Sequence, residues 1–330
     1  MRANTDWFRD AKWGVFVHYL ADIASNTQAI DLDPSDWNRQ VDAIDVSALA
    51  GQLEEVGAGY FYITLGQNSG FYLSPNETYD SIVGREPSRC SQRDIVADLI
   101  AELEPRGIRM MAYFTSSAPA LDKQAIERLK CTPPWEPRLI GFHREVYEDV
   151  PGVDERMTEF QRNWEAVVRE WSLRWGKGCH GWWIDGSYNA DVMYRCPDEP
   201  NFGSFAAALK AGNPDSLVAF NPGVKVPIII HSEHDDYTAG EISDAFPTAS
   251  MYGREKLGRY IDGAQLQILT YLGVGWGQGE PRFSDEFVIG YTKDINRDEG
   301  VVTYDVPTSR EGLIPEAMMR QLRALRDATR

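Results

Sequence analysis

The sequence predicts an α/β protein of the (β/α)8 barrel class. Three features of its 330 residues predict this fold: short runs of apolar, β-branched or aromatic residues recur, amphipathic helical segments separate them, and no Gly/Ser- or Pro-rich linker interrupts the series. A barrel of eight such units typically needs ~250 residues. We therefore expect residues 1–330 to form a single barrel domain, with an open, doubly wound sheet as the alternative.

Seven segments are expected to be buried parallel strands, because a strand covered on both faces needs a continuous apolar run and not an alternating one. They are 13–18 (WGVFVH), 60–65 (YFYITL), 108–114 (IRMMAYF), 181–185 (GWWID), 217–221 (LVAFN), 265–272 (QLQILTYL) and 301–306 (VVTYDV). The eighth strand is expected between residues 221 and 265, either at 227–232 (PIIIHS) or around 236–242 (DYTAGEI).

Five segments between these strands carry apolar residues at spacings of three and four, which places those residues along one face of a helix. The five segments are 45–58, 93–107, 157–178, 202–213 and 314–330. Gly57, Gly107 and Gly178 stand where the C-caps of three of these helices belong. The last helix is expected to pack beside the first strand of the barrel.

Composition restricts the partners of the chain. The 33 Lys and Arg residues are outnumbered by 50 Asp and Glu residues, and the net charge of −17 repels phosphate backbones and anionic lipid. No apolar run reaches the ~18 residues of a membrane span, and the first ten residues lack the apolar region of a signal peptide. We expect a cytoplasmic protein that binds neither nucleic acid nor membranes; a homo-oligomer stays open.

Cysteine and histidine give only a weak metal signal. His231 and His234 form an HxxH pair followed by two aspartates, which can mimic a zinc site, although a solvated loop explains the pattern more simply. A metal-dependent hydrolase or lyase is therefore kept as an alternative, while the leading expectation includes no metal or cofactor. The four cysteines lie far apart and are expected to be reduced thiols: Cys90, Cys131, Cys179 and Cys196.

Active groups of such barrels lie at the C-terminal ends of the strands. That rule selects a set rich in carboxylates and amides: His18, Gln67, Asn68, Asp185, Asn221, Glu241, Tyr271 and Asp305. Aromatic residues flank the set: Trp182, Trp183, Tyr188, Tyr252 and Trp276. Aromatic faces stack on the C–H faces of sugars while carboxylates and amides bond their hydroxyls, so the set indicates a carbohydrate ligand. Only one of the adjacent Trp182 and Trp183 can face the pore.

The strongest local signal is Asp185, which ends an apolar strand and precedes a glycine. A buried acid at this place is either bonded to the amides of its loop or is a nucleophilic carboxylate aimed at an anomeric carbon. The nucleophile needs a second carboxyl with a raised pKa, because a glycosidic oxygen leaves poorly without a proton. The candidates for that acid are Glu241, Glu233, Asp235, Asp236 and Asp305.

Several motifs follow one another along nearly the whole chain: WFRDAKWGVFVHYL (7–20), YITLGQNSGFYLSPNETYD (62–80), RDIVADLIAELEPRGIRMMAYF (93–114), WIDG (183–186), DYTAGE (236–241), VGWGQ (274–278) and DVPTSREGLIPEAMMRQLRALR (305–326). In this order they resemble the catalytic barrel of the alpha-L-fucosidases, glycoside hydrolase family 29. The resemblance implies that Asp185 is the nucleophile of the family's W-F-D-G motif. It also implies that Glu241 is the acid/base of D-Y-x-T-P-E and that His18 is the sugar-binding histidine.

The chain departs from the family in places that bear on specificity. The family's K-H-H-D is replaced by Gly66-Gln67-Asn68-Ser69, so two imidazoles that read sugar hydroxyls are absent, and T-P-E becomes Ala239-Gly240-Glu241. Aryl alpha-L-fucoside is therefore expected to be a poor substrate. The chain also stops where the family's β-sandwich begins, and we expect a divergent, single-domain relative.

These observations predict a retaining exo-glycosidase that acts on a small glycan or glycoside. Asp185 would attack the anomeric carbon, and Glu241 would protonate the leaving group and then activate water, with the two carboxyl groups ~5–5.5 Å apart. Trp183 would form a stacking wall. The rest of the sugar subsite would be His18, Gln67, Asn68, Asn221, Tyr271 and Trp276. The alternative is a sugar-binding pseudo-glycosidase that has lost the chemistry.

Overall fold

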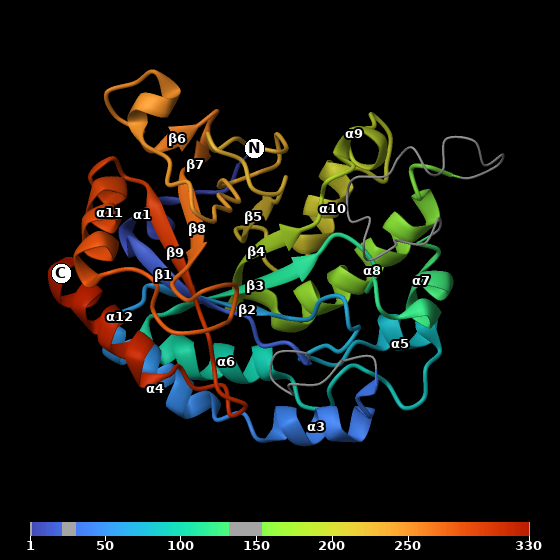
Figure 1. The fold of residues 1–330 in the computed structure, drawn as a ribbon. Coiled ribbons are helices and arrows are strands. Elements are labelled where there is room, and N and C mark those ends of the chain that lie inside the picture. Colours follow the sequence, from blue (N-terminus) through green and yellow to red (C-terminus); the bar gives the residue numbers. More distant parts are fainter. Residues whose placement is uncertain (1, 22–30, 132–153, 330) are drawn as a thin grey trace.

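The computed structural model describes residues 2–21, 31–131 and 154–329. Its centre is a curled sheet of seven parallel strands in the order β5-β4-β3-β2-β1-β9-β8, with helices packed around it (Figure 1). The seven strands predicted from apolar runs are confirmed to within two residues at each end. They are β1 (Trp13–Val17), β2 (Tyr60–Thr64), β3 (Arg109–Thr115), β4 (Cys179–Asp185), β5 (Leu217–Phe220), β8 (Gln267–Tyr271) and β9 (Val301–Val306).

The closed, eight-stranded barrel is wrong for this chain: the sheet is an open half-barrel whose edges are β5 and β8. Neither candidate for the eighth strand, 227–232 or 236–242, forms a regular strand. The second candidate makes two isolated parallel bridges, Tyr237 with Gln265 and Glu241 with Leu269. Residues 236–242 therefore run along β8 without extending the sheet.

A side chain replaces the backbone ladder between these two bridges. The hydroxyl of Thr238 donates to the carbonyl of Gln267 at 2.7 Å and accepts from the Gln267 amide at 2.9 Å. Gly240 has a φ of +63°, and a β-carbon there would stand 1.9 Å from the Gln267 carbonyl oxygen. This turn of the backbone prevents an extended strand and requires glycine.

The exposed edge of β5 is satisfied in a similar way. Its backbone N–H groups at Val218 and Phe220 donate to the carboxylates of Asp236 and Asp235, each at 2.9 Å. Lys210 also donates to Asp236 at 2.6 Å. Because these carboxylates occupy the positions of strand carbonyls, β5 needs no regular eighth strand beside it.

The five predicted helices are confirmed as α4 (Val46–Val56), α6 (Ile95–Leu103), α8 (Thr158–Trp175), α10 (Phe202–Leu209) and α12 (Glu316–Thr329). α12 packs on α4 and α11, and its Thr329 carbonyl accepts from the amine of Lys12, the residue before β1. None of the helices in the described ranges is long and apolar enough to cross a bilayer. Helices that the sequence patterns did not predict are α1 (Asp6–Ala11), α3 (Pro34–Asp42), α5 (Glu77–Val83), α7 (Lys123–Leu129), α9 (Ala190–Met193) and α11 (Asp285–Arg297).

Two of the three glycine caps are confirmed. Gly57 ends α4 and Gly107 ends the short 3-10 helix η2 (Glu104–Arg106), both in the left-handed region. The prediction for Gly178 is wrong, because α8 ends at Trp175 and Gly176 is its cap, with a φ of +51°. Gly178 serves close packing instead: a β-carbon there would stand 2.4 Å from the side chain of Ile100 on α6.

The adjacent tryptophans of β4 point to opposite sides of the sheet, as the alternation of a strand requires. Trp182 faces the helices, where its ring stacks on Trp175 at 5.6 Å. Trp183 faces the concave side, where its ring stacks on Tyr113 of β3 at 5.3 Å. The prediction that only one of the pair faces inward is confirmed.

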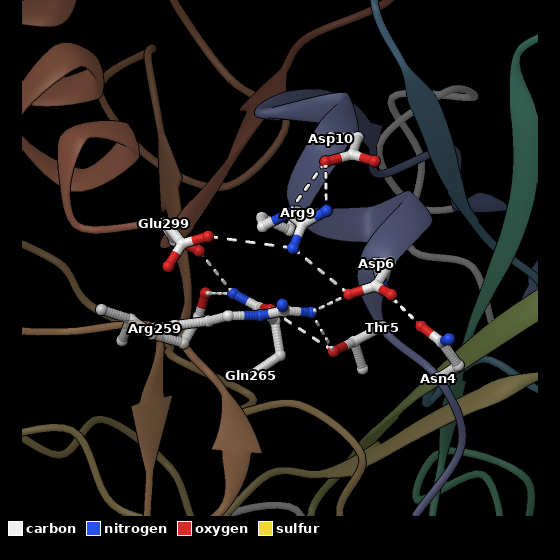
Figure 2. Close-up of polar contacts among 9 residues, drawn as sticks. Asn4, Thr5, Asp6, Arg9, Asp10, Arg259, Gln265 and Glu299 are labelled. Carbon is white, nitrogen blue, oxygen red and sulfur yellow. Dashed lines mark hydrogen bonds and ion pairs between the residues drawn. The ribbon is translucent and has the colours of Figure 1, made fainter.

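The amino-terminal end of the sheet is covered by α1. Phe8 of this helix packs on Tyr60 and Tyr237 inside the curl of the sheet. Figure 2 shows Arg259 joining this end of the chain to Gln265: its guanidinium donates to Asp6 at 2.6 Å and to Gln265 at 2.9 Å. Gln265 belongs to the small hairpin of β6 (Tyr260–Ile261) and β7 (Ala264–Gln265). The predicted site residues lie at the opposite, C-terminal end of the strands.

Candidate functional site

Asp185 is the last residue of β4 and carries four hydrogen bonds. Its Oδ1 accepts from the Gly186 amide at 2.8 Å, from the Tyr188 hydroxyl at 3.3 Å and from the Asn221 amide at 2.9 Å. Its Oδ2 accepts from the Tyr113 hydroxyl at 2.5 Å. Gly186 has a φ of +80°, which turns its N–H back toward the carboxylate. Both oxygens of this carboxyl group therefore act as hydrogen-bond acceptors.

Asn221 joins Asp185 to Glu241. Its Nδ2 donates to Asp185 Oδ1 at 2.9 Å and to Glu241 Oε2 at 2.7 Å, while its Oδ1 accepts from the Gly223 amide. That last bond fixes which end of the amide faces the acids. Because both bonds start from one nitrogen, the two carboxylate oxygens lie at most about 5.6 Å apart, the two bond lengths laid end to end.

Glu241 has the environment of an acid that keeps its proton. Burial raises its pKa to about 7, and the negative charge of Asp185 contributes in the same direction. The hydrogen bond from Asn221 and the nearby His18 lower it in part. One carboxyl with four donors and a second with a raised pKa are therefore held together by one amide.

Gln67 reaches the pair through a tyrosine. Its Nε2 donates to the Tyr113 hydroxyl at 2.6 Å, and that hydroxyl donates to Asp185. Burial raises the pKa of Tyr113 well above its usual value, so the phenol stays protonated and can donate. Gln67 thus orients the donor of Asp185 and leaves its own carbonyl oxygen for another partner.

The loop of Gln67 and Asn68 is tied to the loop that follows β3. The Asn68 carbonyl accepts from the Leu121 amide at 2.8 Å, and Arg89 donates to the Ser69 carbonyl at 2.7 Å. Arg89 also pairs with the buried Asp122, 3.2 Å away. These contacts hold the backbone of the loop in place and so position the side chains of Gln67 and Asn68.

His18 is held by Asp305. The His18 Nδ1 lies 2.7 Å from Asp305 Oδ1, and Asp305 Oδ2 accepts from the Gly277 amide at 2.5 Å. Asp305 is fully buried, so it positions the imidazole and does not meet a ligand itself. This places Asp305, one of the five candidate acids, outside the catalytic pair.

Aromatic rings surround the imidazole. Trp276 packs on His18 at 5.5 Å and edge-on against Tyr271 at 4.9 Å. The Arg282 guanidinium lies 3.8 Å from the centre of the Tyr271 ring. Trp183 is only 3% exposed and donates to the Ala239 carbonyl at 2.9 Å, so it supports the backbone before Glu241 and offers little surface to a sugar.

The other candidate acids lie elsewhere. Asp235 and Asp236 are buried and bonded to the edge of β5, and the side chain of Glu233 is 88% exposed beside His234. Among the residues that the structure describes, no group of three or more histidine, cysteine or acidic side chains could hold a metal ion. The two histidines of the HxxH pair therefore form no metal centre with described partners.

Sequence reasoning did not single out Tyr113 or Gly277, although both contact the site. Tyr113 could have been found from the alternation of its strand: it shares a face with Met111, two residues earlier, and that face is the concave one. The Gly277 amide carries no side-chain signal, and only the folded loop places it beside Asp305.

No protein-family model matches the chain, and no curated protein matches it in sequence. Solved structures resemble it in fold. Endo-fucoidan hydrolase MfFcnA9 of glycoside hydrolase family 107 matches with a TM-score of 0.68 and 15% identity over 98% of this chain and 63% of that chain. Endo-fucoidan hydrolase MfFcnA4 of the same family matches with a TM-score of 0.68 and 16% identity over 98% of this chain and 53% of that one.

An alpha-L-fucosidase of family 29 from Bacteroides thetaiotaomicron matches with a TM-score of 0.62 and 15% identity, over 99% of this chain and 74% of that chain. This chain therefore spans less than two thirds of the two hydrolases named before it. At these identities the similarity establishes the fold that the chain shares with fucosidases and endo-fucoidan hydrolases.

Proposed function

We propose that the protein is a glycoside hydrolase that removes a terminal sugar with retention of configuration. Asp185 is the nucleophile and Glu241 is the acid/base. The fold shared with fucosidases and endo-fucoidan hydrolases supports the reaction class. No cofactor takes part in this reaction, because the chemistry needs only two carboxyl groups and water.

The observation that carries this proposal is the amide of Asn221 between the two acids. It limits the distance between Asp185 Oδ1 and Glu241 Oε2 to about 5.6 Å and so brings the two carboxyl groups together, which favours the close spacing of retaining glycosidases, ~5–5.5 Å between carboxyl groups, over the ~6.5–9.5 Å of inverting ones. Asp185 Oδ2 accepts one bond while Oδ1 accepts three, so Oδ2 has a lone pair free to attack. Glu241 Oε2 accepts from Asn221, which leaves Oε1 to carry the proton for the leaving group.

The residues around the pair complete a sugar subsite in this proposal. His18, Gln67, Asn68 and Asn221 supply hydrogen bonds, and Tyr271 and Trp276 supply apolar ring surface. Tyr113 and Tyr188 hold the charge of Asp185, while Trp183 supports the acid loop from behind.

A panel of 4-nitrophenyl glycosides tests the function. The wild-type enzyme should hydrolyse at least one sugar of the panel, and Asp185→Asn should abolish turnover of every one of them. Glu241→Ala should still form the glycosyl-enzyme from these substrates, because 4-nitrophenolate leaves without a proton. Hydrolysis of the glycosyl-enzyme should be slow in this variant, and added azide should speed its breakdown. Glu233→Gln is the matched control and should behave like wild type. Binding of a sugar without turnover would favour the pseudo-glycosidase.

A further inference from the structure

The His-x-x-His motif is not used by the catalytic pair, yet it lines a cavity of about 460 Å³. One side of the cavity is formed by the segment after β4, which includes α9 and α10, and the other side by the loop after β5. Figure 1 shows α9 and α10 beside each other near these two strands. Small-molecule sites typically measure ~300–1,000 Å³. The residues of its wall that matter here are Tyr194, Arg195, Phe202, His231, Glu233 and His234.

His231 links this cavity to the loop of Asp185. Its Nε2 lies 2.6 Å from the carbonyl oxygen of Ser187, and its Nδ1 lies 3.3 Å from the Arg195 guanidinium. Since the carbonyl can only accept and the guanidinium can only donate, the ring is neutral with its proton on Nε2. The wall of the cavity is thus bonded to the backbone two residues after the nucleophile.

The charges of the cavity suit a neutral ligand with several hydroxyl groups. Arg195 is paired with Asp191 at 2.5 Å and donates to the His231 carbonyl, so its charge is already compensated. The side chains of Glu233 and His234 pair with each other at 3.5 Å, and because they are 88% and 40% exposed, both can reach a ligand. A carboxylate at this position repels phosphate and sulfate groups.

Apolar surface completes the wall. Phe202 stacks on Tyr194 at 5.0 Å and packs edge-on against His231 at 5.5 Å. The Phe202 and Tyr194 rings are only 4% and 3% exposed, so they stiffen the wall of the cavity, and the polar side chains are left to contact a ligand.

We propose that this cavity is an extension subsite that binds a neutral sugar unit adjoining the one attacked by Asp185. The inference rests on the proposed function and names its substrate class: an oligosaccharide, not a simple glycoside. Glu233 and His234 bond the hydroxyl groups of the second unit.

The test compares two substrates that share one terminal sugar. The first is the 4-nitrophenyl glycoside that the panel above selects, and the second is a neutral trisaccharide that ends in the same sugar. The double variant Glu233→Gln/His234→Ala should lose about tenfold in kcat/KM on the trisaccharide, mainly through KM. On the aryl glycoside it should stay within about twofold of wild type. Glu127→Gln, an exposed carboxylate on α7, is the control and should change neither value.

Equal losses on both substrates, or no loss on the trisaccharide, would overturn the subsite while leaving the glycosidase in place. A sulfated trisaccharide that is turned over better than the neutral one would overturn the ligand class. If wild-type enzyme hydrolyses no glycoside of the panel, the proposed function itself fails and the subsite fails with it.

Discussion

At the scale of single residues, Glu241 has an environment that makes activity depend on pH. Burial and the charge of Asp185 raise its pKa to about 7, so the side chain carries a proton below that pH and loses it above. An alkyl glycoside needs this proton to release its leaving group, whereas a 4-nitrophenyl glycoside does not.

We predict that kcat/KM for an alkyl glycoside falls about tenfold per pH unit above pH 7, because the protonated fraction of Glu241 falls at that rate. For the 4-nitrophenyl glycoside the decline in the same range should be much smaller. Initial rates between pH 5 and 9 measure both profiles. Parallel profiles for the two substrates would show that Glu241 is not the acid.

The same carboxyl should lower stability at alkaline pH. Its pKa is about 7 in the folded state and 4.5 by its usual value, so between these values the folded state binds more protons than the unfolded state. Stability from this group is therefore full below pH 4.5 and is lost as pH rises through 7.

Glu241→Gln removes this dependence and keeps an acceptor for Asn221. We predict that the variant gains up to ~3 kcal/mol in free energy of unfolding relative to wild type at pH 8, and much less at pH 4. Urea unfolding at both pH values measures the difference. An equal gain at pH 8 and pH 4 would mean that burial does not raise the pKa of Glu241.

Tyr113 acts through the nucleophile and is a positioning residue. We predict that Tyr113→Phe lowers kcat ~10- to 100-fold with little change in KM, because the lost bond holds the charge and orientation of Asp185 and not the substrate. Tyr304→Phe is the control: this buried hydroxyl bonds Thr292 in the outer layer, away from the site. A change in KM alone would place the Tyr113 hydroxyl on the sugar.

At the scale of elements, the seven strands of the sheet could be predicted from the sequence, whereas the lack of a regular eighth strand at residues 236–242 could not. Continuous apolar runs identify β1 to β5, β8 and β9, because each is buried on both faces. Residues 236–242 lack such a run. In this part of the chain, the side chains of Asp235, Asp236 and Thr238 make hydrogen bonds that the backbone of a regular strand would make. Their partners on β5 and β8 are distant in sequence, so no local pattern shows this exchange.

The replacement of backbone hydrogen bonds by a side chain can be tested at Thr238. Thr238→Val removes the hydroxyl and leaves both backbone groups of Gln267 without a partner in a buried place, at a cost of ~2–4 kcal/mol in free energy of unfolding. Thr248→Val is the control, because this hydroxyl is exposed and bonds the nearby hydroxyl of Ser250. Equal stability of the two variants would show that the hydroxyl of Thr238 does not replace the ladder.

At the scale of the whole molecule, the rule of strand ends identified most of the candidate site. It selected His18, Gln67, Asp185, Asn221 and Glu241, and the structure brings these residues into one network of hydrogen bonds and charges. It also selected Asp305 as a possible acid, although that residue is buried behind His18. Whether a strand-end residue such as Asp305 or His18 reaches the surface depends on the packing of the folded chain, which the pattern of a single sequence does not show.

Specificity should depend on Gln67 and Asn68, the two amides in the loop that follows β2. Because Gln67 uses one N–H on Tyr113, it offers a sugar hydroxyl its second N–H and its carbonyl oxygen, and not an imidazole nitrogen. We predict that kcat/KM for 4-nitrophenyl alpha-L-fucoside is at least ~100-fold below that of the best sugar of the panel, because hydroxyls left unpaired in the site raise the barrier. Comparable values for the two sugars would contradict this prediction.

In the proposed reaction, Asp185 forms a covalent bond with the sugar. The most direct measurement is the mass of Glu241→Ala after mixing with its 4-nitrophenyl substrate, followed by peptide mapping, because this variant should lack the base for the second step and accumulate the intermediate. We predict a mass increase of one glycosyl unit on the peptide that contains Asp185. Release of 4-nitrophenol and free sugar of inverted configuration, with no adduct on any peptide, would contradict it.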